Sequence, residues 1–209
     1  QLWTDTRSRG RANPAWLTPP GFEDWQDGNH TFASMAAYQG WAPDLTDAGE
    51  PESLSGAAAS WNYFGVLGVT PAIGRGFSAA DDNENAAKVV ILSDGLWRRR
   101  FGADASVIGR SIQLGGDPWT GRGVLPKDFR SPVRADVWRT MRRPANSGCG
   151  RGCVVLRAIG RLKPGVTLAQ AKSDLDVIAA RNAAAYPQSN KGVSSWPIAL
   201  HEQVTGPTR

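Results

Sequence analysis

The chain has 209 residues, of which 41% are hydrophobic and 21% charged, so it can bury a core as one composite domain or as two small subdomains. Its longest dense apolar run, residues 89–92, is far shorter than the about 20 residues of a membrane-spanning helix. The net charge is +5, but 19 acidic residues are scattered among 24 basic ones, which argues against nucleic acid as a partner.

The sharpest basic clusters are interpreted as solvated helix or loop faces, in preference to sites for nucleic acid or anionic lipid. They are Arg98, Arg99 and Arg100, and Arg139 with Arg142 and Arg143.

The first elements are short. Phe22 and Trp25 lie three residues apart after Pro19 and before Gly28, which predicts an amphipathic helix over 19–29. Residues 32–35 are expected to add a helical turn before an extended segment at 36–41. Small residues at 54–60 predict a strand, and a helical turn is expected at 61–68, ended by Gly68.

The centre of the chain is rich in predicted strands. Residues 88–93 form a short apolar run typical of a buried strand, and Ser93 can cap a helix over 94–101. The inward face of that helix is expected to consist of Leu96, Trp97 and Phe101. Further strands are predicted at 112–114 and 119–125, which form a hairpin around a glycine-containing turn, and at 137–138.

The last part of the chain predicts a β-α-β unit. A strand over 154–162 precedes a helix that begins with a capping box, formed by Thr167 and Gln170. The inward face of this helix repeats at helical spacing and is stopped by Pro187: Leu168, Ala171, Leu175, Ile178 and Asn182. A final strand is expected at 195–200.

Helix and strand at both ends, with short strands between them, predict an α+β protein. We expect residues 1–60 and 150–209 to form a discontinuous α/β subdomain and residues 61–149 to form a β-rich subdomain inserted into it.

Motifs that carry chemistry are missing from the sequence. His30 and His201 are the only histidines and have no evident partners. The acidic segment 81–85 starts like a calcium loop, but Ala86 and Leu92 occupy positions that need glycine and glutamate, so a solvated turn is expected there. No phosphate-binding loop, dinucleotide motif or nucleophile elbow occurs. We therefore expect no catalytic residues, no metal and no cofactor.

The two cysteines, Cys149 and Cys153, lie in a glycine-rich stretch. Without further cysteines, and with both histidines far away in sequence, they do not complete a zinc site. A local disulfide is favoured if the compartment is oxidising, and two free thiols are the alternative.

Nine tryptophans are the one unusual feature of the composition. Their amphipathic rings suit either a core or the stacking of a ligand. Trp25, Trp61 and Trp97 stand beside apolar residues, so the core interpretation is favoured.

Several sequence segments, in their order and spacing from about Pro19 to Arg209, resemble those of the MacB-like periplasmic core domain, in particular that of the large duplicated permeases common in Acidobacteria. They are YFGVLGVTPAIGRGF at 63–77, VILSDGLW at 90–97, RRFG at 99–102, VIGR at 107–110, GVLP at 123–126, IGRLKPGVT at 159–167 and LHEQ at 200–203. We expect four glycines in these segments to lie in turns or to have positive φ angles: Gly68, Gly74, Gly76 and Gly109.

The resemblance implies an extracytoplasmic domain of an ABC transporter permease. The terminal subdomain would be porter-like and the inserted one sabre-like, on the periplasmic side of the inner membrane. Its partners would be its own membrane helices, a second permease domain and a separate cytoplasmic ATPase, with docking of a periplasmic adaptor left open. The implied function is to couple ATP hydrolysis to periplasmic movement for export. The alternative is a capture domain that binds a lipid, peptide or antibiotic.

Overall fold

The computed structural model describes residues 2–5, 17–47, 49–142 and 150–200. The chain divides into two compact units, Gln1–Ala37 with Asn146–Arg209, and Tyr38–Ala145. Both units contain helices and strands, so the predicted α+β class is confirmed. The chain first passes between the units at 37/38. The boundary expected from the sequence lies further along the chain, at 60/61.

The first unit is built on strands in the order β12 (Ser194–Pro197), β1 (Leu2–Asp5), β11 (Arg157–Leu162) and β2 (Phe32–Trp41), the last of which ends in the second unit. β1 is antiparallel to both β11 and β12, so these two strands are parallel and α4 (Leu168–Ala185) connects them. The predicted β-α-β unit is thus present. The strand β1 between its two strands was not predicted.

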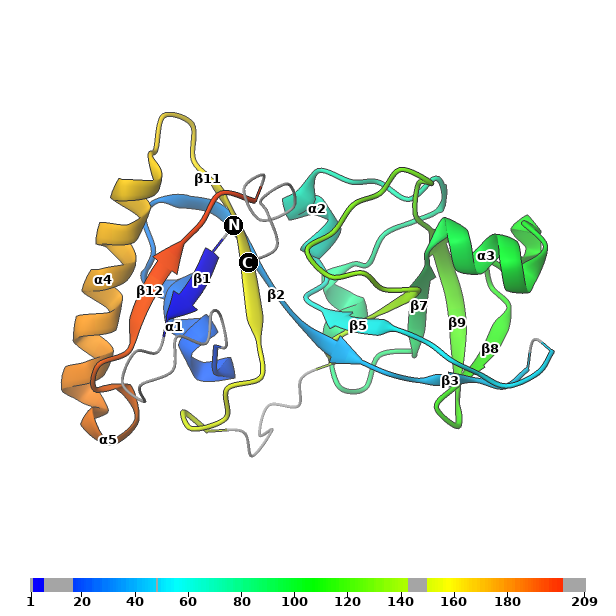
Figure 1. Ribbon diagram of the computed structural model, residues 1–209, viewed down its shortest axis with the longest axis horizontal. Helices are drawn as coiled ribbons and strands as arrows, with labels where there is room; N and C mark the ends of the chain where they lie inside the picture. Colours follow the sequence, from blue (N-terminus) through cyan, green and yellow to red (C-terminus); the bar gives the residue numbers. More distant parts are fainter. Residues whose placement is uncertain (1, 6–16, 48, 143–149, 201–209) are drawn as a thin grey trace, which may run out of the picture. The chain divides into compact units, whose positions relative to one another are not determined.

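Two capped helices cover this sheet. The hydroxyl of Thr18 accepts a hydrogen bond from the Gly21 N–H at the start of α1 (Pro19–Gly28), and the predicted capping box of Thr167 and Gln170 opens α4. In Figure 1, α4 runs along β12, and α1 lies beside α4. The predicted inward residues of α4 are buried except Leu168, which is 37% exposed because it is the first residue of the helix. Pro187 stops α4 and begins the single turn α5 (Pro187–Asn190).

The second unit contains a mixed sheet. Its strands follow the order β5 (Gly56–Ala59), β10 (Val137–Thr140), β7 (Val89–Leu92), β9 (Asp117–Val124), β8 (Ser111–Leu114), β3 (Asp44–Leu45) and β4 (Glu52–Ser53), while β6 (Ile73–Gly74) pairs with β9. β5 pairs with the end of β2. The β5–β10 and β7–β9 pairs are parallel, and the β8–β9 pair is the predicted hairpin.

The expectation of a helical turn at residues 32–35 is wrong, because β2 begins at Phe32. Phe32 and Met35 are buried, and sheet pairing overrides the local helical spacing of this segment.

The central strand β7 of the second unit is buried on both faces, as its all-apolar sequence requires. On one face, α3 (Asp94–Phe101) inserts Leu96, Trp97 and Phe101, as predicted, into a cluster that includes Val90 and Leu92. On the other face, aromatic rings surround Trp138, which contacts Phe64 and Phe129 at centroid distances of 6.0 and 5.7 Å. Phe64 belongs to the short helix α2 (Tyr63–Leu67).

Two glycines are required by this geometry. Gly68 ends α2 with φ +74°, as predicted. Gly74, also at φ +74°, packs so tightly that a Cβ would lie 2.3 Å from the Arg122 carbonyl oxygen. Gly109 has positive φ as well, whereas Gly76 does not, so the expectation for Gly76 is wrong.

Candidate functional site

His30, one of the two histidines considered for catalysis, makes a structural contact through its backbone. The His30 backbone N–H donates to Asp174 Oδ2 at 2.7 Å, and Thr31 donates to the same oxygen. These bonds attach residues 30–31 to the side of α4. These bonds outweigh the effect of burial and hold the pKa of Asp174 below its ordinary value. His201 lies outside the described residues. Within the described ranges, no group of three or more His, Cys, Asp or Glu side chains could hold a metal ion.

The acidic segment 81–85 is an exposed turn at residues 83–85, as its composition predicted, but Asp81 is an exception. Asp81 is only 7% exposed and belongs to a single 3-10 turn, Ala79–Asp82. Its carboxylate accepts bonds from the Ser78 backbone and hydroxyl, and it forms ion pairs with Arg122 at 2.7 Å and Arg75 at 3.5 Å. Burial by itself would raise the pKa of Asp81, but these hydrogen bonds and the two guanidinium charges lower it. This cluster anchors the turn.

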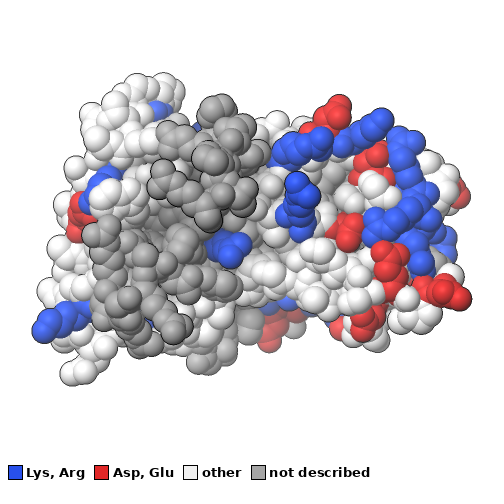
Figure 2. Space-filling model, viewed as in Figure 1, with Lys and Arg blue, Asp and Glu red and all other residues white. Residues whose placement is uncertain are grey.

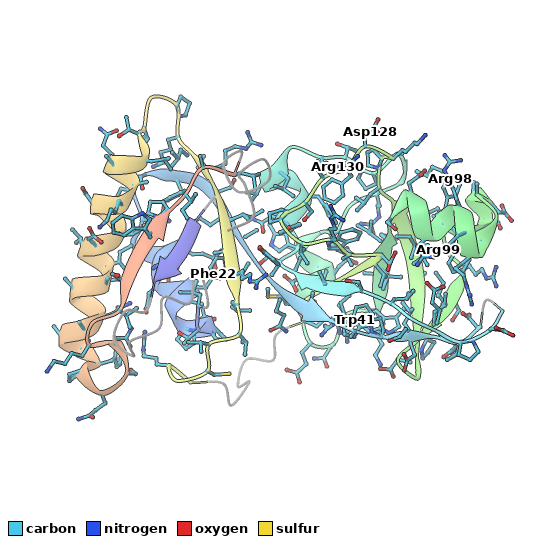
Figure 3. The ribbon with its side chains drawn as sticks, viewed as in Figure 1. Phe22, Trp41, Arg98, Arg99, Asp128 and Arg130 are labelled. Carbon is cyan, nitrogen blue, oxygen red and sulfur yellow. The ribbon has the colours of Figure 1, made fainter. Side chains whose placement is uncertain are left out.

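The arginines of α3 lie in a mixed-charge surface. Figure 2 shows Lys and Arg gathered over this end of the second unit with Asp and Glu between them. Arg98, labelled in Figure 3, pairs with Asp94 at 2.8 Å, and Arg99 bridges Glu52 and Asp136 at 2.6 and 3.0 Å. The solvated-face interpretation holds for Arg98. Arg100 instead has its side chain only 17% exposed and contacts Glu52.

The candidate functional site is a hollow of about 380 Å³ in the second unit, which we call the Trp41 hollow. Its aromatic wall is made by Trp41, labelled in Figure 3 at the end of β2, and Trp119 on β9, whose ring centroids are 5.2 Å apart. Gly56 lies beneath Trp41, where a Cβ would come within 3.0 Å of the indole ring. Arg139, Lys88 and Arg142 contribute positive charge to the same lining.

Arg139 is the distinctive group of the Trp41 hollow. Its guanidinium lies 5.2 Å from the Trp41 ring centroid and 5.8 Å from that of Trp119, and its Nη1 donates to the Thr140 carbonyl at 3.0 Å. Its Nε is buried and has no hydrogen-bond partner among the described residues. Burial, followed by the nearby charge of Arg142, lowers the pKa of Arg139.

The neighbouring cations are already bonded. Lys88 pairs with Asp117 at 2.6 Å, and the Arg142 guanidinium donates to the carbonyl oxygens of Glu84 and Ala86. Sequence reasoning placed Arg139 on a solvated face and missed this site. The available signal was the alternation within Val137, Trp138 and Arg139, which puts the arginine on an inward-facing strand position.

The tryptophans divide between core and surface. Trp25 and Trp97 are buried, as predicted. Trp61 is 44% exposed, so its expected place in the core is wrong: it precedes α2, and its backbone N–H donates to Asp82. Among the predicted disulfide pair, Cys149 lies outside the described residues, and a Cys149–Cys153 disulfide stays a prediction.

Comparisons with known proteins define the class of this fold. The family model of the MacB-like periplasmic core domain matches residues 2–178. Similar solved structures are the periplasmic region of MacB from Actinobacillus actinomycetemcomitans (12% identity, 100% of this chain and 92% of that chain, TM-score 0.65) and the extracellular domain of the noncanonic ABC-type transporter YknZ from Gram-positive bacteria (16%, 95% and 97%, 0.63). A domain assigned to a permease of Porphyromonas gingivalis is also similar (16%, 99% and 95%, 0.67). The comparison with curated proteins gives no significant match.

A mixed α+β domain of this kind, matched over most of its length, is the extracytoplasmic part of a transporter permease. The chain belongs to the MacB-like periplasmic core domain family of ABC transporter permeases. Over the described ranges, no helix is both long and apolar enough to cross a bilayer.

Proposed function

We propose that this domain is a mechanical element of its transporter: it moves as rigid bodies outside the membrane in response to ATP hydrolysis by a separate cytoplasmic ATPase. The observation that carries the proposal is the family match over residues 2–178. In this proposal the parent chain lies in the inner membrane, is of the duplicated type common in Acidobacteria, and exports its substrate. The domain is not itself an enzyme.

The packing of each unit supports a rigid lever. In the second unit, β7 is buried on both faces and α3 packs against it. The ion pair of Asp81 with Arg122 stabilises the turn that precedes β7. In the first unit, Arg151 donates to Asp24 on α1 and lies 3.7 Å from the Tyr186 ring centroid at the end of α4. Close-packed units of this kind move as wholes and transmit displacement without deforming. We assign the first unit to the porter-like subdomain and the second to the sabre-like one.

The partners of the domain follow from the same proposal. They are its own transmembrane helices, a second permease domain and the cytoplasmic ATPase. A periplasmic adaptor is a further candidate partner.

The test is a distance measurement in the full transporter with its ATPase, reconstituted in liposomes. A spin label at Asp128→Cys, an exposed position labelled in Figure 3, would report the distance to a matching label on the second permease domain. Cys149 and Cys153 would be replaced by serine. We expect the distance distribution to differ between the nucleotide-free and ATP-bound states. Identical distributions in a preparation that hydrolyses ATP would contradict the mechanical proposal.

Substrate capture is the second candidate function, and the Trp41 hollow is the observation that favours it. Titration with lipids, peptides and antibiotics, followed by tryptophan fluorescence, separates the two. A saturable change with a transported compound supports capture, and a flat response supports a purely mechanical domain.

A further inference from the structure

The Trp41 hollow combines an arginine that has no ion-pair partner in the described part of the chain with an aromatic surface. The Arg139 guanidinium is half-buried beside two indole rings and forms no ion pair among the described residues. Asp82 acts on its charge only through space, and Asp117, which also lines the hollow, is paired with Lys88. Buried charges are ordinarily paired, and the stacking on Trp41 and Trp119 compensates only part of the cost of desolvation. A ligand anion would complete the pairing.

The bonding of the other cations limits the charge of that anion. Lys88 is held by Asp117 at 2.6 Å. Arg142 is held by two carbonyl oxygens through its guanidinium, and its backbone N–H donates to Asp82. Of the described residues that line the hollow, Arg139 alone is left to neutralise an incoming group, so a single negative charge fits and a phosphate dianion does not.

The planar guanidinium of Arg139 favours a carboxylate as the anionic group of the ligand. A guanidinium offers a planar pair of N–H donors that matches the two oxygens of a carboxylate. Beside it, Trp41 is half-buried and presents its ring to the hollow, while Leu114 and Met141 add apolar lining. A volume of about 380 Å³ is at the lower end of small-molecule sites and accommodates a ring or short alkyl chain.

We propose that the Trp41 hollow binds a monocarboxylate that carries an aromatic or alkyl body. The carboxylate pairs with the Arg139 guanidinium, and the apolar body lies against Trp41. Two sources share this chemistry: a free apolar acid and the C-terminal carboxylate of a peptide. The site does not depend on the mechanical function proposed above, so failure of one leaves the other standing.

The first experiment uses 3-phenylpropionate as the probe and intrinsic tryptophan fluorescence as the readout. We expect saturable binding in the millimolar range or tighter, and much weaker binding of 3-phenylpropan-1-ol, which lacks the charge, and of acetate, which lacks the body. A tripeptide ending in phenylalanine, compared with its C-terminal amide, distinguishes the sources: tighter binding of the peptide acid than of phenylpropionate indicates a peptide terminus, and the reverse indicates a free acid. Absence of saturable binding by both acids, or equal binding of the alcohol, would overturn the proposal.

The second experiment tests the residue. Arg139→Gln removes the charge and Arg139→Lys keeps it while removing the planar fork; we expect both to weaken binding about tenfold or more. Arg110→Gln is the matched control, because Arg110 also stacks on an aromatic ring, that of Phe101, but lies outside the hollow. An unchanged affinity in folded Arg139→Gln would refute the assignment.

Because β10 is a central strand, Arg139 variants can lose their fold, so the unsubstituted protein provides a further readout. With 5-fluorotryptophan incorporated, we expect the ¹⁹F resonance that disappears in Trp41→Phe to shift on addition of 3-phenylpropionate. Resonances of Trp25 and Trp138, which are buried elsewhere, should not move. Shifts confined to those two residues would place the ligand outside the Trp41 hollow and contradict the proposal.

Discussion

At the scale of single residues, the charged groups divide into those that hold the fold and those that are left for other tasks. Asp81 is buried yet satisfied, by Ser78, Arg122 and Arg75. Arg139 is half-buried, but the only hydrogen bond of its guanidinium among the described residues is to a carbonyl. The first pattern is typical of a structural anchor and the second of a site that interacts with something else.

The anchor makes a prediction about stability. Asp81→Asn leaves Arg122 and Arg75 without their shared carboxylate, and we expect it to lower the free energy of unfolding by about 2 kcal/mol at neutral pH. Asp128→Asn, at an exposed position, is the control and should change stability little. Urea unfolding measures both.

The pH dependence of the same variant has a definite sign. Because the folded-state pKa of Asp81 is lowered, its contribution is complete above the unfolded value of about 4 and is lost as the pH falls further. The difference in stability between the parent protein and Asp81→Asn should therefore shrink below about pH 4. A constant difference down to pH 2 would show that the ionised carboxylate is not what stabilises the turn.

At the scale of elements, the capping and close-approach signals explain most of the helix and strand ends. Ser93 caps α3 through the Leu96 N–H at 3.0 Å, and Gly102, in the left-handed region, ends it. On β9, Gly121 lies against the Val107 carbonyl, to which an added Cβ would approach within 2.2 Å. The helix ends follow from local chemistry, whereas the constraint on Gly121 comes from another segment of the chain, the 3-10 turn Ala105–Val107.

A glycine in close backbone contact and a glycine on an exposed helix face predict opposite changes in stability for substitution by alanine. Gly121→Ala should destabilise the protein by about 1–3 kcal/mol, because the backbone of Val107 must move. Gly95→Ala, on the exposed face of α3 with only the Ser93 hydroxyl within 4 Å, should stabilise it by about 0.5–1 kcal/mol through helix propensity. Thermal unfolding of the two variants in parallel measures the contrast, and a neutral Gly121→Ala would contradict the close approach.

At the scale of the whole molecule, each compact unit has a core of its own, and the polypeptide passes between the units at 37/38 and 145/146. The family context makes the domain one part of a larger transporter. Contacts between such domains are usually modest in area and polar, so they do not persist in dilute solution.

The isolated domain is accordingly expected to be a monomer. Sedimentation velocity at micromolar concentration should give one species near the mass of 22.4 kDa. A tight dimer under these conditions would show that the domain carries a self-association surface strong enough to act without the membrane helices.

The sequence by itself determined the local elements: the capped helices α3 and α4, the buried strand β7 and the β8–β9 hairpin were predicted, because caps, periodicity and turn residues act over a few positions. Only the tertiary structure decided the pairing of β1 between β11 and β12, the strand conformation at Phe32, the burial of Asp81 and the meeting of Arg139 with Trp41 and Trp119. These features depend on segments that are far apart in the chain. Their partners are chosen by sheet order and packing, which no local pattern of residues specifies.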